Sequence, residues 1–137
     1  MRYMTIYKPG YETTAPPTPE HMADMGRLIE DLAKTGKLIA TDGLQHSSKG
    51  ARVRLNEDGS FTVTDGPFTE AKEIIGGFAI IKADSKEEII EMTKTFLRVA
   101  GGGESEIRLM HDQSAFDSQS TARSANAGQR QQESTAR

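Results

Sequence analysis

Residues 74–82, with the sequence IIGGFAIIK, make up the longest apolar strand that the chain predicts. Alternate side chains of a strand point to opposite faces of a sheet, and here both sets are apolar. Such a strand needs cover on both faces. The Gly76-Gly77 pair within it predicts a bulge or a close backbone approach. One set comprises Ile74, Phe78 and Ile80, and the other Ile75, Ala79 and Ile81.

Two amphipathic helices flank further short strands. Thr18 is a good cap, Pro19 suits the first helical position, and the helix they begin is expected to end at Gly36. A capping box at residues 85–88 begins the second helix, which is expected to end at the glycines 101–103. Each helix has an apolar stripe at helical spacing, so each should bury one side against the sheet.

The remaining strands are short and separated by turn residues. Arg52 and Arg54 alternate with apolar residues before the turn Glu57-Asp58-Gly59, which predicts a hairpin with one wet face. The strands are expected at 3–7, 38–41, 53–55, 61–63, 74–82 and 106–110.

The order of these elements predicts an α+β, ferredoxin-like fold. It consists of an antiparallel sheet with two helices on one face and an inserted β-hairpin. The helices cover only one face, so the two-sided strand predicts that a second copy packs on the other. We therefore expect a homodimer.

Composition separates the body from the C-terminal end. Residues 112–137 contain one Phe and no Leu, Ile, Val or Met. They are expected to form a disordered, low-complexity tail after a single domain at 1–111.

Other features exclude classes of function. The net charge of −3 weighs against direct nucleic-acid binding, and the chain has no Cys for disulfides or thiolate chemistry. His21, His46 and His111 show no metal-ligand spacing, and no cofactor motif is present. Without a membrane span or signal peptide, the expected location is the cytoplasm.

Three segments resemble the DGPF proteins of the YCII-related family. They are VTDGPFTEAKEIIGGFAIIKADSKEEIIE, GKLIATDGLQHSSKGARVR and GGGESEIRLM, and together the resemblance covers roughly residues 1–110. It implies a ferredoxin-like fold of the dimeric α/β-barrel type. It also implies that a His near the start of the first helix and an Asp form an active pair. Related domains include a dehydrochlorinase-like enzyme and modules linked to extracytoplasmic-function sigma factors.

His21 is the leading candidate for a reactive group. It lies near the N-terminus of the first helix, close to the apolar stripe, where an imidazole could act as acid or base. A half-buried, hydrogen-bonded helix-start His is the structural alternative. Asp42, after a strand, and Asp65 are its candidate partners. Asp65 precedes Gly-Pro, so ordinary turn chemistry is the favoured explanation for it, and a role in the site is the alternative.

Charged residues near these positions could line a pocket. Glu70 and Lys72 follow the DGPF segment, and Arg52 belongs to a small basic cluster with His46, Lys49 and Arg54. Charge runs more often form a solvated surface.

Three functions remain open from the sequence. The first is a small-molecule-binding dimer with acid–base chemistry at His21, which leaves open whether the protein is an enzyme. The second is a non-enzymatic interaction module that acts with a sigma factor or another protein. The third is a structural dimer without chemistry in a cleft.

Overall fold

The structure is a computed structural model that describes residues 1–70, 72 and 74–112. The predicted disordered tail lies outside the described residues, apart from Asp112. The elements are β1 (Arg2–Lys8), α1 (Pro19–Lys34), β2 (Leu38–Gly43), the 3₁₀ turn η1 (Ser47–Lys49), β3 (Ala51–Leu55), β4 (Phe61–Asp65), β5 (Gly77–Lys82), α2 (Lys86–Ala100) and β6 (Glu104–Leu109).

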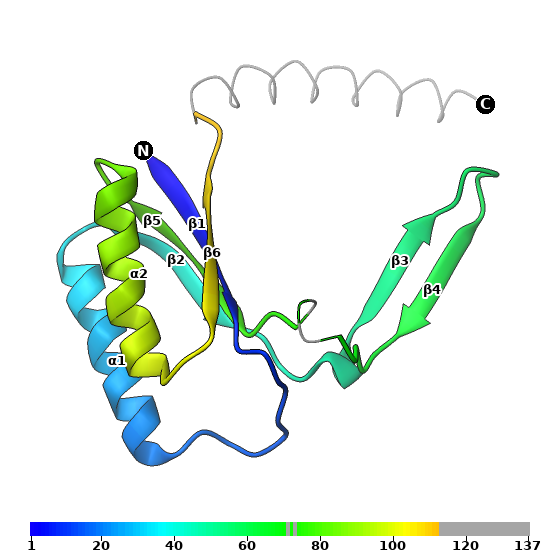
Figure 1. The fold of residues 1–137 in the computed structure, drawn as a ribbon, viewed down its shortest axis with the longest axis horizontal. Coiled ribbons are helices and arrows are strands. Elements are labelled where there is room, and N and C mark those ends of the chain that lie inside the picture. Colours follow the sequence, from blue (N-terminus) through cyan, green and yellow to red (C-terminus); the bar gives the residue numbers. More distant parts are fainter. Residues whose placement is uncertain (71, 73, 113–137) are drawn as a thin grey trace, which may run out of the picture.

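Four of the strands form one antiparallel sheet in the order β2-β5-β1-β6. Both helices cover the same face of this sheet (Figure 1). The predicted ferredoxin-like α+β fold with an inserted hairpin is therefore confirmed. The opposite face, which we call the open face, has no helix over it in the described part of the chain.

Capping chemistry sets the helix boundaries as the sequence predicts. Thr18 accepts a hydrogen bond from the backbone N–H of His21 at 3.1 Å, and Ser85 accepts one from Glu88 at 3.1 Å. Gly101, with φ of 88°, ends α2 in the left-handed conformation that favours glycine.

The hydrophobic core lies between the helices and one end of the sheet. Ile89 of α2 is fully buried, and Tyr3, Ile81 and Ala83 are each at most 5% exposed. Register explains this arrangement, since Tyr3 pairs with Ile81 and both therefore point toward the helices.

β5 begins later than predicted. The sequence predicts a strand from residue 74, but β5 starts at Gly77. Instead, Gly76 donates its N–H to Tyr7 at 2.8 Å and accepts one from Leu44 at 2.9 Å. The predicted close approach is confirmed, because a β-carbon at Gly77 would lie 2.8 Å from the carbonyl oxygen of Asp42. The register irregularity falls in β2, between Leu38 and Ala40.

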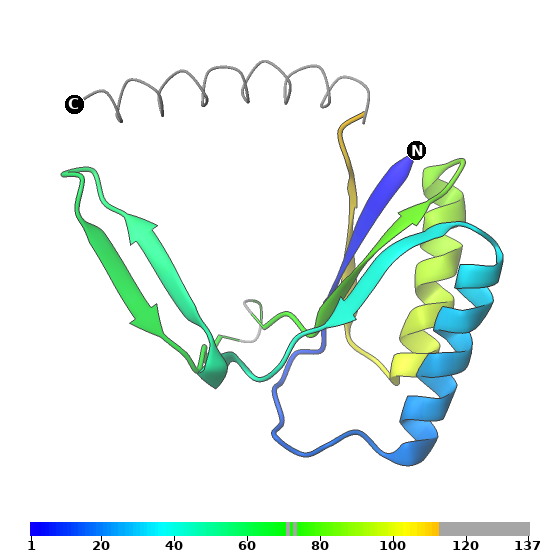
Figure 2. The same ribbon diagram turned by 180° about the vertical axis from the view of Figure 1, so that it is seen from behind.

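β3 and β4 form a separate two-stranded sheet that projects from the body (Figure 2). We call this hairpin, residues 51–65, the arm. It extends on the side of the open face, away from the helices.

Candidate functional site

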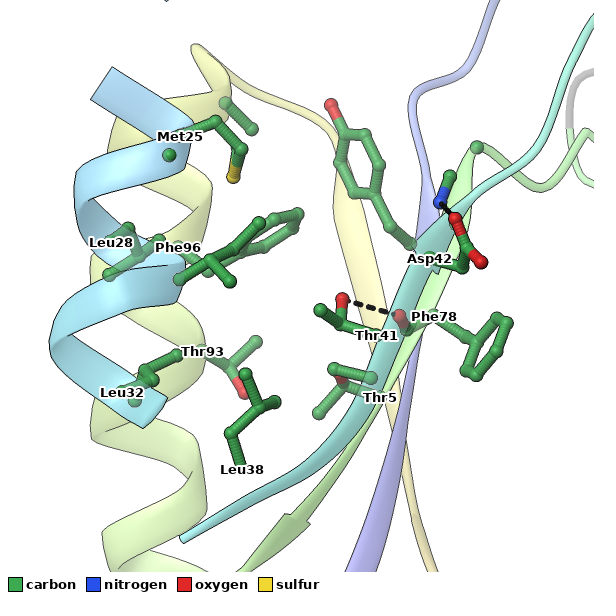
Figure 3. A pocket seen from close by; sticks show the side chains of 18 of the residues that line it. Thr5, Met25, Leu28, Leu32, Leu38, Thr41, Asp42, Phe78, Thr93 and Phe96 are labelled. Carbon is green, nitrogen blue, oxygen red and sulfur yellow. Dashed lines mark hydrogen bonds between the residues drawn. The ribbon is translucent and has the colours of Figure 1, made fainter. Parts of the chain in front are cut away.

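A cavity of about 600 Å³ lies between the two helices and the sheet (Figure 3). Its walls are mainly apolar. Residues from α1 and α2 form one side, and residues from β1, β2 and β5 form the other. The principal side chains are Tyr7, His21, Met25, Leu28, Thr41 and Phe96.

Small residues on the sheet leave this space unfilled. Thr5, Gly77 and Ala79 line the cavity from β1 and β5. Longer side chains from the helices, such as Met25 and Phe96, extend toward them without reaching across (Figure 3). Close-packed interiors fill such gaps with side chains, so this end of the sheet differs from the core end at Tyr3.

Tyr7 forms one wall of the cavity. Its ring meets Phe96 edge-on at a centroid distance of 5.1 Å, and its hydroxyl donates to the carbonyl oxygen of Gly102 at 3.0 Å. Burial, with a smaller contribution from Tyr11, raises the pKa of Tyr7. A β-carbon at Gly103 would lie 2.8 Å from the Tyr7 ring, so the glycines after α2 make room for this tyrosine.

His21 and Asp42 both line the cavity, as a shared site would require. His21 is half-buried in the first turn of α1, where the Thr18 cap fixes its backbone. The Asp42 carboxylate accepts a hydrogen bond from the Gly43 N–H at 3.0 Å and points with Phe78 away from the helices (Figure 3). The described residues contain no hydrogen bond between His21 and Asp42, so their pairing stays a prediction.

The other predicted site residues lie outside the cavity. Asp65 ends β4, opposite Ala51. The Arg52 guanidinium lies 3.8 Å from the centre of the Phe68 ring. Lys72 pairs with Glu70 at 3.4 Å, with both side chains largely exposed. The structure does not bring these four residues to His21, and their roles in a site stay predictions.

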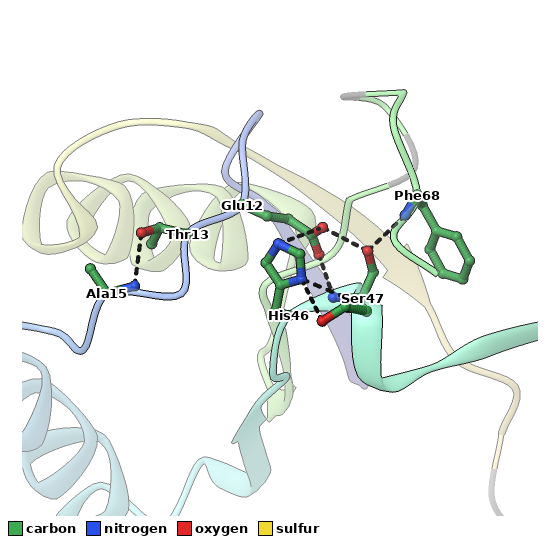
Figure 4. Close-up of polar contacts among 7 residues, drawn as sticks. Glu12, Thr13, Ala15, His46, Ser47 and Phe68 are labelled. Atoms are coloured by element: carbon green, nitrogen blue, oxygen red, sulfur yellow. Dashed lines mark hydrogen bonds and ion pairs between the residues drawn. The ribbon is translucent and has the colours of Figure 1, made fainter. Parts of the chain in front are cut away.

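A second polar cluster joins three distant segments at the base of the arm (Figure 4). Glu12 accepts hydrogen bonds from the Ser47 backbone N–H at 2.9 Å and from its hydroxyl at 2.6 Å, and pairs with His46 Nε2 at 3.6 Å. The Ser47 hydroxyl in turn accepts the N–H of Phe68 at 2.8 Å. The Ser47 hydroxyl therefore gives its proton to the carboxylate and not to the imidazole, whereas His46 Nδ1 lies 2.9 Å from the hydroxyl oxygen of Ser48.

The same contacts hold the glutamate ionised. The Ser47 hydroxyl, and then its backbone N–H and the charge of His46, lower the pKa of Glu12 against the opposing effect of burial. The role of this cluster is therefore to tie the loop before α1 to η1 and to the corner that follows the arm.

Sequence reasoning missed Glu12 and Tyr7. Glu12 stands in a proline-rich loop 35 residues from Ser47, and no local pattern marks the contact. Tyr7 is an ordinary aromatic strand residue. Its neighbours Gly76, Gly77 and Gly103 are distant in the sequence and come together with Tyr7 only in the fold.

The described residues offer no group of three or more His, Asp or Glu side chains that could hold a metal ion. Within the same ranges, none of the helices is both long and apolar enough to cross a membrane.

These features define an α+β protein with a ferredoxin-like sheet and an apolar cavity under its two helices. The chain belongs to the YCII-related family: the model of the YCII-related domain matches residues 1–111. This confirms the family predicted from the DGPF segment. No curated protein matches the chain.

A solved structure that is similar to the chain has 17% sequence identity and a TM-score of 0.42. It is 5-chloro-2-hydroxyhydroquinone dehydrochlorinase from Burkholderia phenoliruptrix AC1100, in complex with 2,5-dihydroxybenzoquinone. The alignment covers 83% of this chain and 98% of that chain.

Proposed function

We propose that the protein binds a small, mainly apolar molecule in the cavity between its helices and its sheet. The observation that carries this proposal is the cavity itself, about 600 Å³ of space lined by methionine, leucine and aromatic side chains with few polar groups. Pockets of this size and character are typical small-molecule sites.

The polar groups of the wall favour a ligand that donates hydrogen bonds. Thr41 donates its hydroxyl proton to Phe78 at 2.9 Å, Thr93 to Ile89 at 2.7 Å, and Tyr7 to Gly102 at 3.0 Å. Because each hydroxyl already donates its proton to a backbone carbonyl, these oxygens can only accept a further hydrogen bond from a ligand. A hydroxylated ring compound would match apolar walls that carry hydrogen-bond acceptors.

His21 is the proposed acid–base group. Its position in the cavity wall allows the imidazole to accept a proton from a ligand hydroxyl. Asp42 is the proposed second member of the site. In this structure its side chain points to the open face with that of Phe78, so β2 itself would have to move for the carboxylate to meet His21.

Ligand binding can be tested by filling the cavity. Gly26 lines it from α1, and a β-carbon there meets nothing within 4 Å. We expect Gly26→Leu to fold and to abolish binding of substituted phenols, measured by calorimetry and thermal shift. Ala33→Leu, exposed on the same helix and outside the lining, is the matched control and should bind like the wild type. No ligand among matched phenols and their non-hydroxylated analogues, or equal binding by Gly26→Leu, would contradict the proposal.

The role of His21 needs a separate readout. The absorption of 4-nitrophenol distinguishes the phenol from the phenolate. Bound to the wild type near neutral pH it should shift toward phenolate, and bound to His21→Ala it should not. Loss of one hydrogen bond predicts roughly 2- to 10-fold weaker binding by that variant. Identical protonation in both proteins would leave His21 without an acid–base role.

We also propose that the protein is a homodimer in which the open faces of two sheets pack together. The support is that the partly buried apolar side chains of Met4, Ile6, Phe78 and Ile80 lie on a face that no helix covers in the described part of the chain. An interaction module for a sigma factor or another protein, and a structural dimer without a ligand, are the rival functions. A failed ligand screen together with a stable dimer would favour them. The cytoplasmic location stays a prediction.

A further inference from the structure

One face of the arm is apolar and uncovered. Val53 pairs with Val63 and Leu55 pairs with Phe61 across the hairpin, so these four side chains share one face. They are 67%, 63%, 64% and 67% exposed, respectively. The alternating residues, including the two arginines and two threonines, occupy the other face. Soluble monomers rarely expose contiguous apolar patches of this kind.

Among the described residues, no other strand pairs with the arm. β3 and β4 pair only with each other, and an isolated two-stranded hairpin is at best marginally stable in water. The arm nevertheless leaves the body at a fixed base. Gly66 donates its N–H to Gly50 at 3.0 Å, Phe68 donates to Ser47, and Arg52 stacks on the Phe68 ring.

The open face of the body lies on the side toward which the arm extends (Figures 1 and 2), and it carries a second set of apolar side chains, each partly buried. Met4 pairs with Ile80 and Ile6 pairs with Phe78. Because they alternate with the residues that face the helices, all four lie on the open face.

The C-terminal segment of the chain is a poor occupant for either surface. Residues 113–137 contain Phe116 as their only large apolar side chain. A second copy of the chain, in contrast, brings both an apolar arm and an apolar sheet face. In a two-fold assembly any contact between these surfaces occurs twice.

We propose that two copies clasp each other, each laying the apolar face of its arm on the partner chain beside the partner's open sheet face. The interface surface is Val53, Leu55, Phe61 and Val63, with the arginine and threonine face of the hairpin left in water. This interface is independent of whether the cavity binds a ligand.

Introducing a negative charge on either face of β4 tests the interface. Phe61→Glu places a carboxylate in the proposed contact, whereas Thr64→Glu places one on the opposite face of the same strand. Burying an unpaired charge in an interface should raise the dimer dissociation constant of Phe61→Glu by about 30-fold or more, measured by sedimentation. Thr64→Glu should dimerise like the wild type. Equal dimerisation of both variants, or a wild type that is monomeric at micromolar concentration, would overturn the proposal.

A thiol-protection experiment tests the same interface without placing a charge on the arm. The chain has no cysteine, so Val53→Cys and Thr64→Cys each introduce a single thiol. As protein concentration rises, maleimide labelling of Val53→Cys should slow in proportion to the fraction of dimer, and labelling of Thr64→Cys should not. Protection of Val53→Cys that is independent of concentration would show that the same chain covers the arm and would refute the clasp. Benzoylphenylalanine at position 61 should cross-link to a differently labelled chain, at residues that border its open face. Cross-links confined to one chain, or to residues 113–137, would also refute it.

Discussion

Gly66 lies so close to Ser47 that a β-carbon at position 66 would be 1.8 Å from the Ser47 carbonyl oxygen. The contact explains why the corner after the arm, Asp65-Gly66-Pro67-Phe68, needs glycine at its second position. On one side of Gly66 the arm ends, and on the other Phe68 bonds to the same serine. The DGPF segment thus packs the end of the arm against η1.

Gly66→Ala should destabilise the protein by about 1–3 kcal/mol, the usual cost of overpacking a site whose neighbour is backbone. Gly50→Ala is a close control, since its φ is −121° and its β-carbon would lie at an ordinary 3.6 Å from the same oxygen. Urea unfolding of both variants measures the difference. Equal urea midpoints for the two variants would show that the backbone at this corner accommodates a β-carbon without loss of stability.

Glu12→Gln should lower stability at neutral pH and lose its effect in acid. The Ser47 hydroxyl holds the pKa of Glu12 below its ordinary value of 4.5, so the ionised carboxylate stabilises the folded state above that pH. The contribution disappears as pH falls through the lower, folded-state pKa. The urea midpoints of wild type and variant should therefore stay apart above about pH 4.5 and converge as the pH falls below it. Glu57→Gln, in the exposed turn of the arm, is the control, and a gap for Glu12→Gln that is constant with pH would refute the linkage.

Local chemistry made much of the fold predictable. The helix starts at Thr18 and Ser85 follow from side chains that bond to backbone N–H groups within three residues. The hairpin follows from alternation and its turn. The start of β5 was not predictable in this way, because Gly76 bonds to Tyr7 and Leu44, which are far away in the sequence.

The candidate site was only partly predictable for the same reason. His21 could be placed at the helix start and near the apolar stripe from spacing alone. The cavity depends on which small sheet residues happen to face α1, and that is fixed by the register of three strands. The direction of the Asp42 side chain also follows from strand register, because Asp42 pairs with Phe78 and both point away from the helices.

Gly26→Ala should stabilise the protein by about 0.5–1 kcal/mol, because glycine in a helix interior costs that much relative to alanine. The added methyl group meets nothing within 4 Å. The melting temperature should rise by about 3–5 °C for a body of this size. Gly101→Ala is the opposing case: its φ of 88° disfavours a side chain, and it should lose about 1 kcal/mol or more. A destabilised Gly26→Ala would mean that α1 lies closer to the sheet than the structure places it.

Tyr7→Phe removes the hydroxyl that bonds to Gly102 and keeps the edge-on contact with Phe96. The loss at neutral pH should be about 0.5–1.5 kcal/mol, the net contribution of one such hydrogen bond. Burial raises the pKa of Tyr7, so the folded state favours the neutral phenol and its contribution is complete below pH 10. As pH rises toward and through the folded-state pKa, the phenol of the unfolded wild type ionises more readily than that of the folded protein, so the wild type loses this stability. The phenylalanine variant has no such group, and the two urea midpoints should converge. Tyr11→Phe, at a residue 69% exposed, should change stability little at pH 7. A gap between wild type and Tyr7→Phe that widens above pH 10 would show that the phenolate is stabilised in this wall of the cavity, and would reverse the assignment of Tyr7 as a neutral donor.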